Sequence, residues 1–146
     1  RVAYVGDLLF IGIAPVMWGG PAKAWIQALD RLLEVTGEGW LFVPGHGPVT
    51  DAQGVLSVRR YFEHVDQSVT RDCADLPLAS PDHDEACAER TLASMPPEVR
   101  RDFQEPQRVM ISAAIERMAR RAGGPAKVSV ALKMKYIIKM GEYEVR

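Results

Sequence analysis

Hydrophobic residues in the first part of the chain occur in short runs with the spacing and composition of strands. Two such runs, residues 2–5 and 8–13, are rich in β-branched and aromatic side chains. They are separated by Gly6-Asp7, which predicts two strands joined by a tight connection. A third apolar run at 40–43 predicts another buried strand.

Between and after these strands, the apolar positions change to helical spacing. A first helix is predicted from Pro21 to just before Gly37, with the apolar positions Trp25, Ile26, Leu29, Leu32 and Leu33. Thr50 or Asp51 is expected to cap a second helix, whose apolar stripe consists of Val55, Val58, Phe62 and Val65. The order strand, strand, helix, strand, helix indicates an α/β fold.

After about residue 71 the pattern changes to shorter helical segments interrupted by prolines. The apolar series from Val109 to Met118 predicts a helix that ends near Gly123. Residues 128–140 alternate like a strand, whereas their Ala, Leu, Lys and Met content suits a helix, and both alternatives stay open. We expect an α/β part over residues 1–70, a helical extension over 71–125 and a basic amphipathic tail over 126–146.

Composition excludes two kinds of partner. The chain has 18 basic and 19 acidic residues and a net charge of −1, which predicts binding neither to nucleic acid nor to an anionic membrane. The longest apolar stretch, 8–18, is interrupted by Pro15 and is too short to span a bilayer. No signal peptide is visible, and Cys73 and Cys87 are expected to be reduced thiols, so we expect a cytoplasmic protein. Because the chain opens on Arg1 and passes at once into a strand, we also expect a fragment of a longer protein.

Two side chains with metal-binding chemistry follow predicted strands. Asp7 comes after the first apolar run, and His46 lies in the turn Pro-Gly-His-Gly-Pro at 44–48. A crossover through the intervening helix brings strands into one sheet with their carboxyl ends at one edge, where α/β proteins place their sites. A carboxylate oxygen and an imidazole nitrogen suit zinc, and also iron or manganese.

Gly6-Asp7-Leu8-Leu9-Phe10, then an amphipathic helix, then Pro-Gly-His-Gly-Pro resembles the C-terminal half of the metallo-β-lactamase superfamily over about residues 2–70. The resemblance implies half of an αββα sandwich with a helical C-terminal extension. It also implies that Asp7 bridges two zinc ions and that His46 is the last ligand in chain order. The implied function is hydrolysis of a small-molecule thioester, lactone or related ester or amide by a metal-activated water.

The His-x-His-x-Asp-His motif that supplies the other ligands in that family does not occur in this chain. We therefore expect the missing N-terminal half of the same fold as a partner, and we expect this chain alone to be inactive. An exposed strand edge in the isolated chain is expected to cause self-association. Met17 and Trp18, in the loop 14–20 that leaves the metal edge, are predicted to contact the substrate.

Two alternatives to a hydrolase stay open: a non-catalytic interaction module and a small α/β domain without metal. The acidic cluster 82–85 (Asp-His-Asp-Glu) is interpreted as a helix start with favourable charges, not as a second metal site. His64 is interpreted as a solvated side chain on the charged side of its helix.

Overall fold

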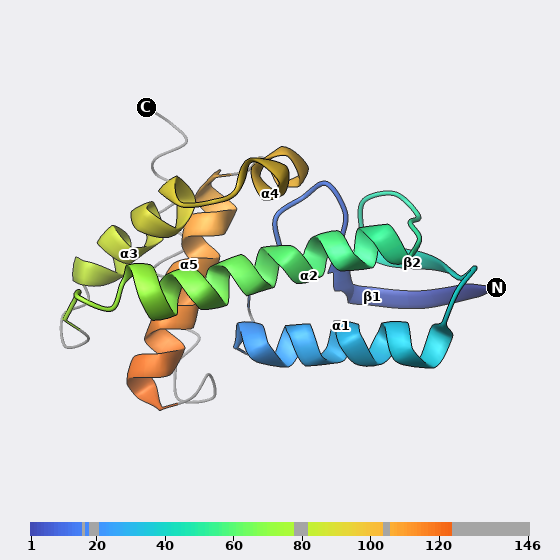
Figure 1. The fold of residues 1–146 in the computed structure, drawn as a ribbon, viewed down its shortest axis with the longest axis horizontal. Helices are drawn as coiled ribbons and strands as arrows, with labels where there is room; N and C mark the ends of the chain where they lie inside the picture. Colours follow the sequence, from blue (N-terminus) through green and yellow to red (C-terminus); the bar gives the residue numbers. More distant parts are fainter. Residues whose placement is uncertain (16, 18–20, 78–81, 104–105, 124–146) are drawn as a thin grey trace.

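The computed structural model describes residues 1–15, 17, 21–77, 82–103 and 106–123, and it has a mixed α/β fold (Figure 1). The elements, in chain order, are β1 (Val2–Phe10), α1 (Ala22–Thr36), β2 (Leu41–His46), α2 (Ala52–Gln67), the π-helical turn η1 (Ser68–Asp72), α3 (Asp82–Ala93), α4 (Pro97–Asp102) and α5 (Pro106–Ala122). The two strands lie at one end of the molecule, and α3 and α5 lie at the other (Figure 1). The coarse prediction of an α/β fold is confirmed.

The two strands form a parallel pair connected by α1. Val2 pairs with Leu41 and Tyr4 with Val43 at the start of the strands. A parallel connection through a helix places the carboxyl ends of both strands at the same edge, as the sequence predicted.

β1 is a single irregular strand, so the expectation of two strands joined by a turn at Gly6-Asp7 is wrong. The register shifts before and after Gly6, which pairs with Pro44, and the last pair of the two strands is Phe10 with His46. Gly6 has a φ of 51°, a conformation that glycine adopts without strain, so the strand bulges there and continues.

One face of this small sheet packs on the helices, and the other is exposed in the part of the chain that the structure describes. Ala3 and Phe42 point into the core, where α1 and α2 also contact each other. Side chains alternate between faces along a strand, so Val2, Tyr4 and Leu41 share the opposite face, and Tyr4 is 84% exposed there. Among the described residues, no layer covers these side chains.

The helix boundaries of the α/β part follow their sequence signals. Asp51 caps α2 by accepting a hydrogen bond of 2.8 Å from the backbone N–H of Gln53, which confirms one of the two predicted caps. Gly37 ends α1, and its N–H donates to the carbonyl of Leu33 at 3.0 Å. The predicted apolar stripe of α2 is fully buried.

α5 holds the start of α1 and the loop that follows β1. The buried carboxylate of Glu116 accepts a hydrogen bond of 2.9 Å from the N–H of Ala22, which satisfies a donor in the first turn of α1. Ser112 donates to the carbonyl of Pro15 at 2.7 Å, and Tyr61 of α2 donates to the same carbonyl at 3.2 Å. These hydrogen bonds from α5 and α2 therefore hold the loop that follows β1 in place.

A buried arginine joins α5 to α3 and to the segment that precedes α3. The Arg117 guanidinium lies 3.3 Å from the Asp84 carboxylate, and both side chains are almost fully buried. Arg117 also donates to the carbonyls of Cys73, Leu76 and Pro77. The interpretation of 82–85 as a helix start agrees with α3, which begins at Asp82. The pairing of Asp84 with Arg117 was not predicted, because the arginine comes from a distant helix.

Cys73 and Cys87 form a disulfide with a Cα–Cα distance of 5.4 Å, so the expectation of reduced thiols is wrong. The bond connects the segment after η1 to α3. Disulfides persist in oxidising compartments, so the cysteines no longer support a cytoplasmic location. That location stays a prediction. Within the described residues, no helix combines the length and apolarity needed to cross a membrane.

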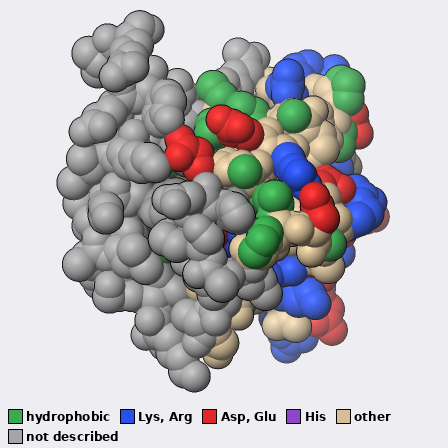
Figure 2. Space-filling model, turned by 90° about the vertical axis from the view of Figure 1, so that its left-hand side faces the viewer, with side chains coloured by type: hydrophobic (Ala, Val, Ile, Leu, Met, Phe, Trp, Pro, Cys, Tyr) green, Lys and Arg blue, Asp and Glu red, His purple; other side chains and the backbone are tan. Residues whose placement is uncertain are grey.

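Figure 2 shows the end of the molecule opposite the strands. On the described part of this face, basic and acidic side chains are interspersed with hydrophobic ones, consistent with the net charge of −1.

The division of the chain into an α/β part, a helical extension and a tail, with boundaries at 70/71 and 125/126, stays a prediction. The tail 126–146, with its strand or helix alternatives, lies outside the described residues.

Replacing Asp84 by Ala should destabilise the protein by about 3–5 kcal/mol, because it leaves the Arg117 charge buried without its partner. Urea denaturation of the variant and the parent chain measures this change. The control is Asp75→Asn, which removes a largely exposed pair with Arg90 and should hardly move the midpoint. Equal midpoints for Asp84→Ala and the parent would show that the buried pair contributes nothing to stability.

Candidate metal centre

The parallel pair brings Asp7 and His46 together at its carboxyl edge. Asp7 lies in the bulged part of β1, and His46 is the last residue of β2. The distance between Asp7 Oδ1 and His46 Nε2 is 3.6 Å. Residues separated by a helix in the sequence therefore present an oxygen and a nitrogen to one point.

This separation fits two ligands of a single ion. Zinc holds nitrogen and oxygen ligands at roughly 2.0–2.2 Å in tetrahedral geometry, which places neighbouring ligand atoms about 3.3 Å apart. Asp7 and His46 are 77% and 51% exposed, so an ion can reach them from solvent. The donor set and its spacing suit zinc, and they also suit iron or manganese.

Gly45 is required for this approach of the two strands. A Cβ at position 45 would clash with Asp7 Oδ1 and would lie 2.9 Å from the backbone nitrogen of Asp7. The glycine before His46 therefore leaves room for the carboxylate beside the imidazole.

The turn after His46 packs closely against the segment after β1. Gly47 has a φ of 91°, and a Cβ there would clash with the carbonyl oxygen of Ile11. The N–H of Ile11 in turn donates to the carbonyl of His46 at 2.9 Å. The segment after β1 and the turn after β2 are thus held against each other.

Phe10 orients the imidazole, and sequence reasoning did not single it out. The rings of Phe10 and His46 stack with centroids 4.7 Å apart and an interplanar angle of 12°. The stacking restricts the rotation of His46 and keeps one ring edge towards Asp7. The available signal was an aromatic residue at the end of the strand that carries Asp7.

The two predicted substrate contacts are not placed at this edge by the described structure. Met17 is fully buried in the hydrophobic core, and Trp18 lies outside the described residues. A substrate contact by either residue stays a prediction. In the described part of the chain, no group of three or more His, Cys, Asp or Glu side chains is arranged so that it could hold a metal ion.

His64 is structural, so its interpretation as a solvated side chain is wrong. Its Nε2 lies 2.7 Å from the carbonyl oxygen of Thr91, to which it donates a hydrogen bond across to α3. Burial lowers the pKa of His64, which favours the neutral ring, although the hydrogen bond to Thr91 opposes this shift. The helical spacing did not reveal this role because α3 approaches from outside the local sequence.

Comparison of the chain with protein-family models, curated proteins and solved structures gave no match. The resemblance to the metallo-β-lactamase superfamily therefore rests on the residues quoted from the sequence. The geometry at Asp7 and His46 is an independent observation.

Replacing Gly45 by Ala should destabilise the protein by about 1–3 kcal/mol, because the new methyl group meets the backbone of β1. Asp7→Ala and His46→Ala remove exposed groups, and each should cost less than about 1 kcal/mol. Thermal or urea unfolding of the three variants measures these changes. If Asp7→Ala costs as much as Gly45→Ala, the carboxylate supports the fold and is not kept available for a ligand.

Proposed function

We propose that this chain is the C-terminal half of a metal-dependent hydrolase of the metallo-β-lactamase superfamily. The observation that carries the proposal is the 3.6 Å approach of Asp7 Oδ1 and His46 Nε2 at the carboxyl edge of a parallel strand pair. The proposed reaction is hydrolysis of a thioester, lactone or related ester or amide.

Asp7 and His46 are the proposed metal ligands in this half. By the resemblance, Asp7 and His46 would be among the residues that hold zinc, with iron or manganese as other fitting ions. When bound, such ions lower the pKa of a water molecule and polarise the carbonyl under attack. Within this chain, Phe10 holds the imidazole in place by stacking, and Gly45 leaves room for the carboxylate.

A catalytic zinc takes three protein ligands, so the remaining ligands are proposed to come from the missing N-terminal half. The bare sheet face with Val2, Tyr4 and Leu41 is the surface that this half would cover. At the outer edge of β2, Phe42 forms an antiparallel bridge with Thr50. The outer edge of β1 has no such pairing, because β1 pairs only with β2 among the described residues. Further strands are therefore expected beside β1.

The bare face also favours one of the rival functions, a non-catalytic interaction module. An exposed apolar sheet face is a docking surface whatever chemistry lies at the strand ends. A module of that kind, or a metal-free α/β domain, has no need for a carboxylate and an imidazole at ligand spacing. Metal binding therefore separates these functions.

The isolated chain should bind Zn²⁺ weakly, because it provides two of the three protein ligands that a catalytic site uses. Asp7→Ala and His46→Ala should each weaken binding at least about tenfold, since even an outer-shell partner of a metal ligand is worth 10- to 100-fold in affinity. Isothermal titration calorimetry with ZnCl₂ measures both effects.

The matched control is His83→Gln, which removes the histidine of the acidic segment 82–85 and should leave zinc affinity unchanged. Binding that survives the loss of both Asp7 and His46 would contradict the proposed centre. Loss of binding in His83→Gln alone would move the metal site to the start of α3.

A further inference from the structure

The outer edge of β1 presents backbone groups that β2 does not use. The N–H of Leu41 donates to the carbonyl of Arg1 at 2.9 Å, so Arg1 and Ala3 turn their backbone groups towards β2. Backbone N–H and carbonyl groups alternate in direction along a strand, so those of Val2 and Tyr4 point away from β2. Among the described residues, β1 pairs only with β2, and this edge is free.

The two edges of the sheet differ in their protection. At the edge of β2, Phe42 is bridged to Thr50, and the strand contains Pro44, which has no N–H to offer. Proteins also block free edges with charged side chains. The regular part of β1, residues 2–5, has the sequence Val-Ala-Tyr-Val and carries neither a charge nor a proline. The edge of β1 is therefore open to another strand.

The side chains beside this edge form an apolar surface. Val2, Tyr4 and Leu41 share the bare sheet face, and Tyr4 is 84% exposed. Val49 joins them, because Thr50 beside it turns its side chain towards α2. Among the described residues, four of the five exposed large hydrophobic side chains thus gather at one place. An exposed apolar patch of this kind marks a site of protein association.

The charges of β1 favour a second copy of the chain in antiparallel orientation. Arg1 precedes the regular part of the strand and Asp7 follows it, and both are exposed. A parallel second copy would place like charges side by side. An antiparallel copy instead brings Arg1 of each chain towards the end of β1 that carries Asp7 in the other. The edge is therefore complementary to itself, as a two-fold interface requires.

We propose that two copies of this chain associate through the outer edges of β1, as antiparallel strands related by a two-fold axis. Val2 of one copy pairs with Tyr4 of the other, and the two Ala3 residues lie opposite each other. All backbone bonds then come from the regular part of β1. A shift of the register by two residues would instead use Gly6, where the strand bulges. Val2 and Tyr4 also form a cross-strand pair of a β-branched and an aromatic side chain.

The pair of strands lies at one end of the molecule (Figure 1), so a second copy reaches β1 without meeting α3 or α5. The paired stretch of residues 2–5 is short, about 13 Å long. Its contact area lies below the roughly 1,200–2,000 Å² of a stable interface. The dimer is therefore weak, with a dissociation constant on the order of 1–100 μM.

This association goes beyond the proposed hydrolase function and needs no metal. The proposed N-terminal half would cover the same surface, so it would compete with the second copy. Zinc binding at Asp7 and His46 and dimerisation through β1 are measured separately, and either can fail without the other.

Sedimentation velocity of the chain tests the proposal. Over about a hundredfold range of protein concentration, the sedimentation coefficient should rise from that of a monomer and level off at that of a dimer. Tyr4→Lys should weaken the dimer about tenfold or more, because it places a charge at the open edge and removes the aromatic partner of Val2. The exposed side chain of Tyr4 makes the change harmless to folding, which circular dichroism checks.

The matched control is Val49→Lys, the introduction of the same charge on the same face but away from the edge of β1. It should leave the dimer unchanged. Dissociation as strong as that caused by Tyr4→Lys would mean that the copies stack face to face, and would overturn the proposal. A chain that stays monomeric throughout, or that assembles beyond a dimer without limit, would overturn it too.

A single introduced cysteine tests the register, because Cys73 and Cys87 are already joined to each other. Opposed residues of a pair without backbone bonds have Cα atoms about 4.5 Å apart, within the range that a disulfide spans. Ala3→Cys should therefore form a covalent dimer in oxidised glutathione, and Tyr4→Cys should not. Cross-linking of Tyr4→Cys in preference to Ala3→Cys would contradict the assigned pairing.

Discussion

The parallel pairing of β1 and β2 is the constraint on which the candidate site depends. Parallel strands end at the same edge, so a carboxylate in β1 and an imidazole at the end of β2 meet although 39 positions separate them in the sequence. The bulge after Gly6 turns the Asp7 side chain towards β2, and Gly45 leaves the space into which it reaches. A regular strand in place of β1 would send the carboxylate elsewhere.

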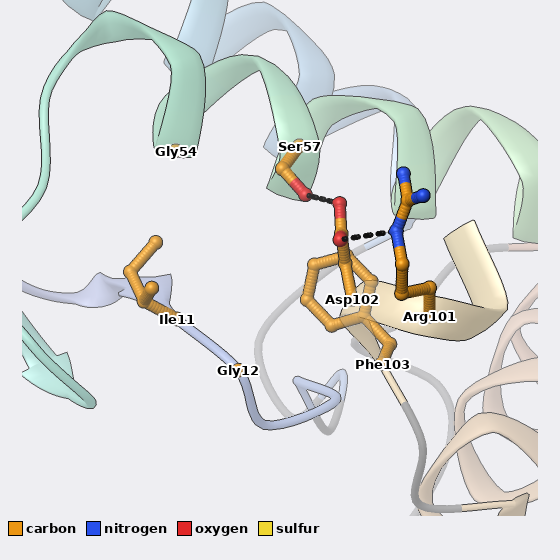
Figure 3. Close-up of a pocket in the computed structure, with 7 residues that line it drawn as sticks. All are labelled: Ile11, Gly12, Gly54, Ser57, Arg101, Asp102 and Phe103. Atoms are coloured by element: carbon orange, nitrogen blue, oxygen red, sulfur yellow. Dashed lines mark hydrogen bonds and ion pairs between the residues drawn. The ribbon is translucent and has the colours of Figure 1, made fainter. Parts of the chain in front are cut away.

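The helices at the far end support this edge indirectly. α5 holds the loop after β1 through Ser112 and the start of α1 through Glu116, so the loop and the crossover helix have fixed positions relative to the strands. α4 then brings Asp102 against α2, where Ser57 donates a hydrogen bond to its carboxylate. The segment after β1, α2 and the end of α4 therefore meet around a hollow lined by Ile11, Ser57 and Phe103 (Figure 3).

Features that depend on local chemistry were predicted from the sequence, and features that depend on distant partners were not. The cap at Asp51 and the apolar stripe of α2 follow from side chains close together in the chain, and both were found. Gly6 was misread because a glycine within a bulged strand and a glycine in a turn have the same local pattern. The hydrogen bond of His64 and the ion pair of Asp84 were not predicted, because their partners, Thr91 and Arg117, come from other helices. The close approach of Asp7 and His46 was predictable because the crossover rule applies to any strand–helix–strand unit.

The most direct measurement of the central claim is paramagnetic broadening by Mn²⁺, which reports where an ion resides on the chain. Substoichiometric Mn²⁺ added to the ¹⁵N-labelled chain broadens amide signals near the bound ion. If Asp7 and His46 form half of a metal centre, the strongest broadening falls on residues 6–7 and 45–47 and disappears in Asp7→Ala. Broadening centred on residues 82–85, or equally strong broadening in the Asp7→Ala variant, would contradict the account.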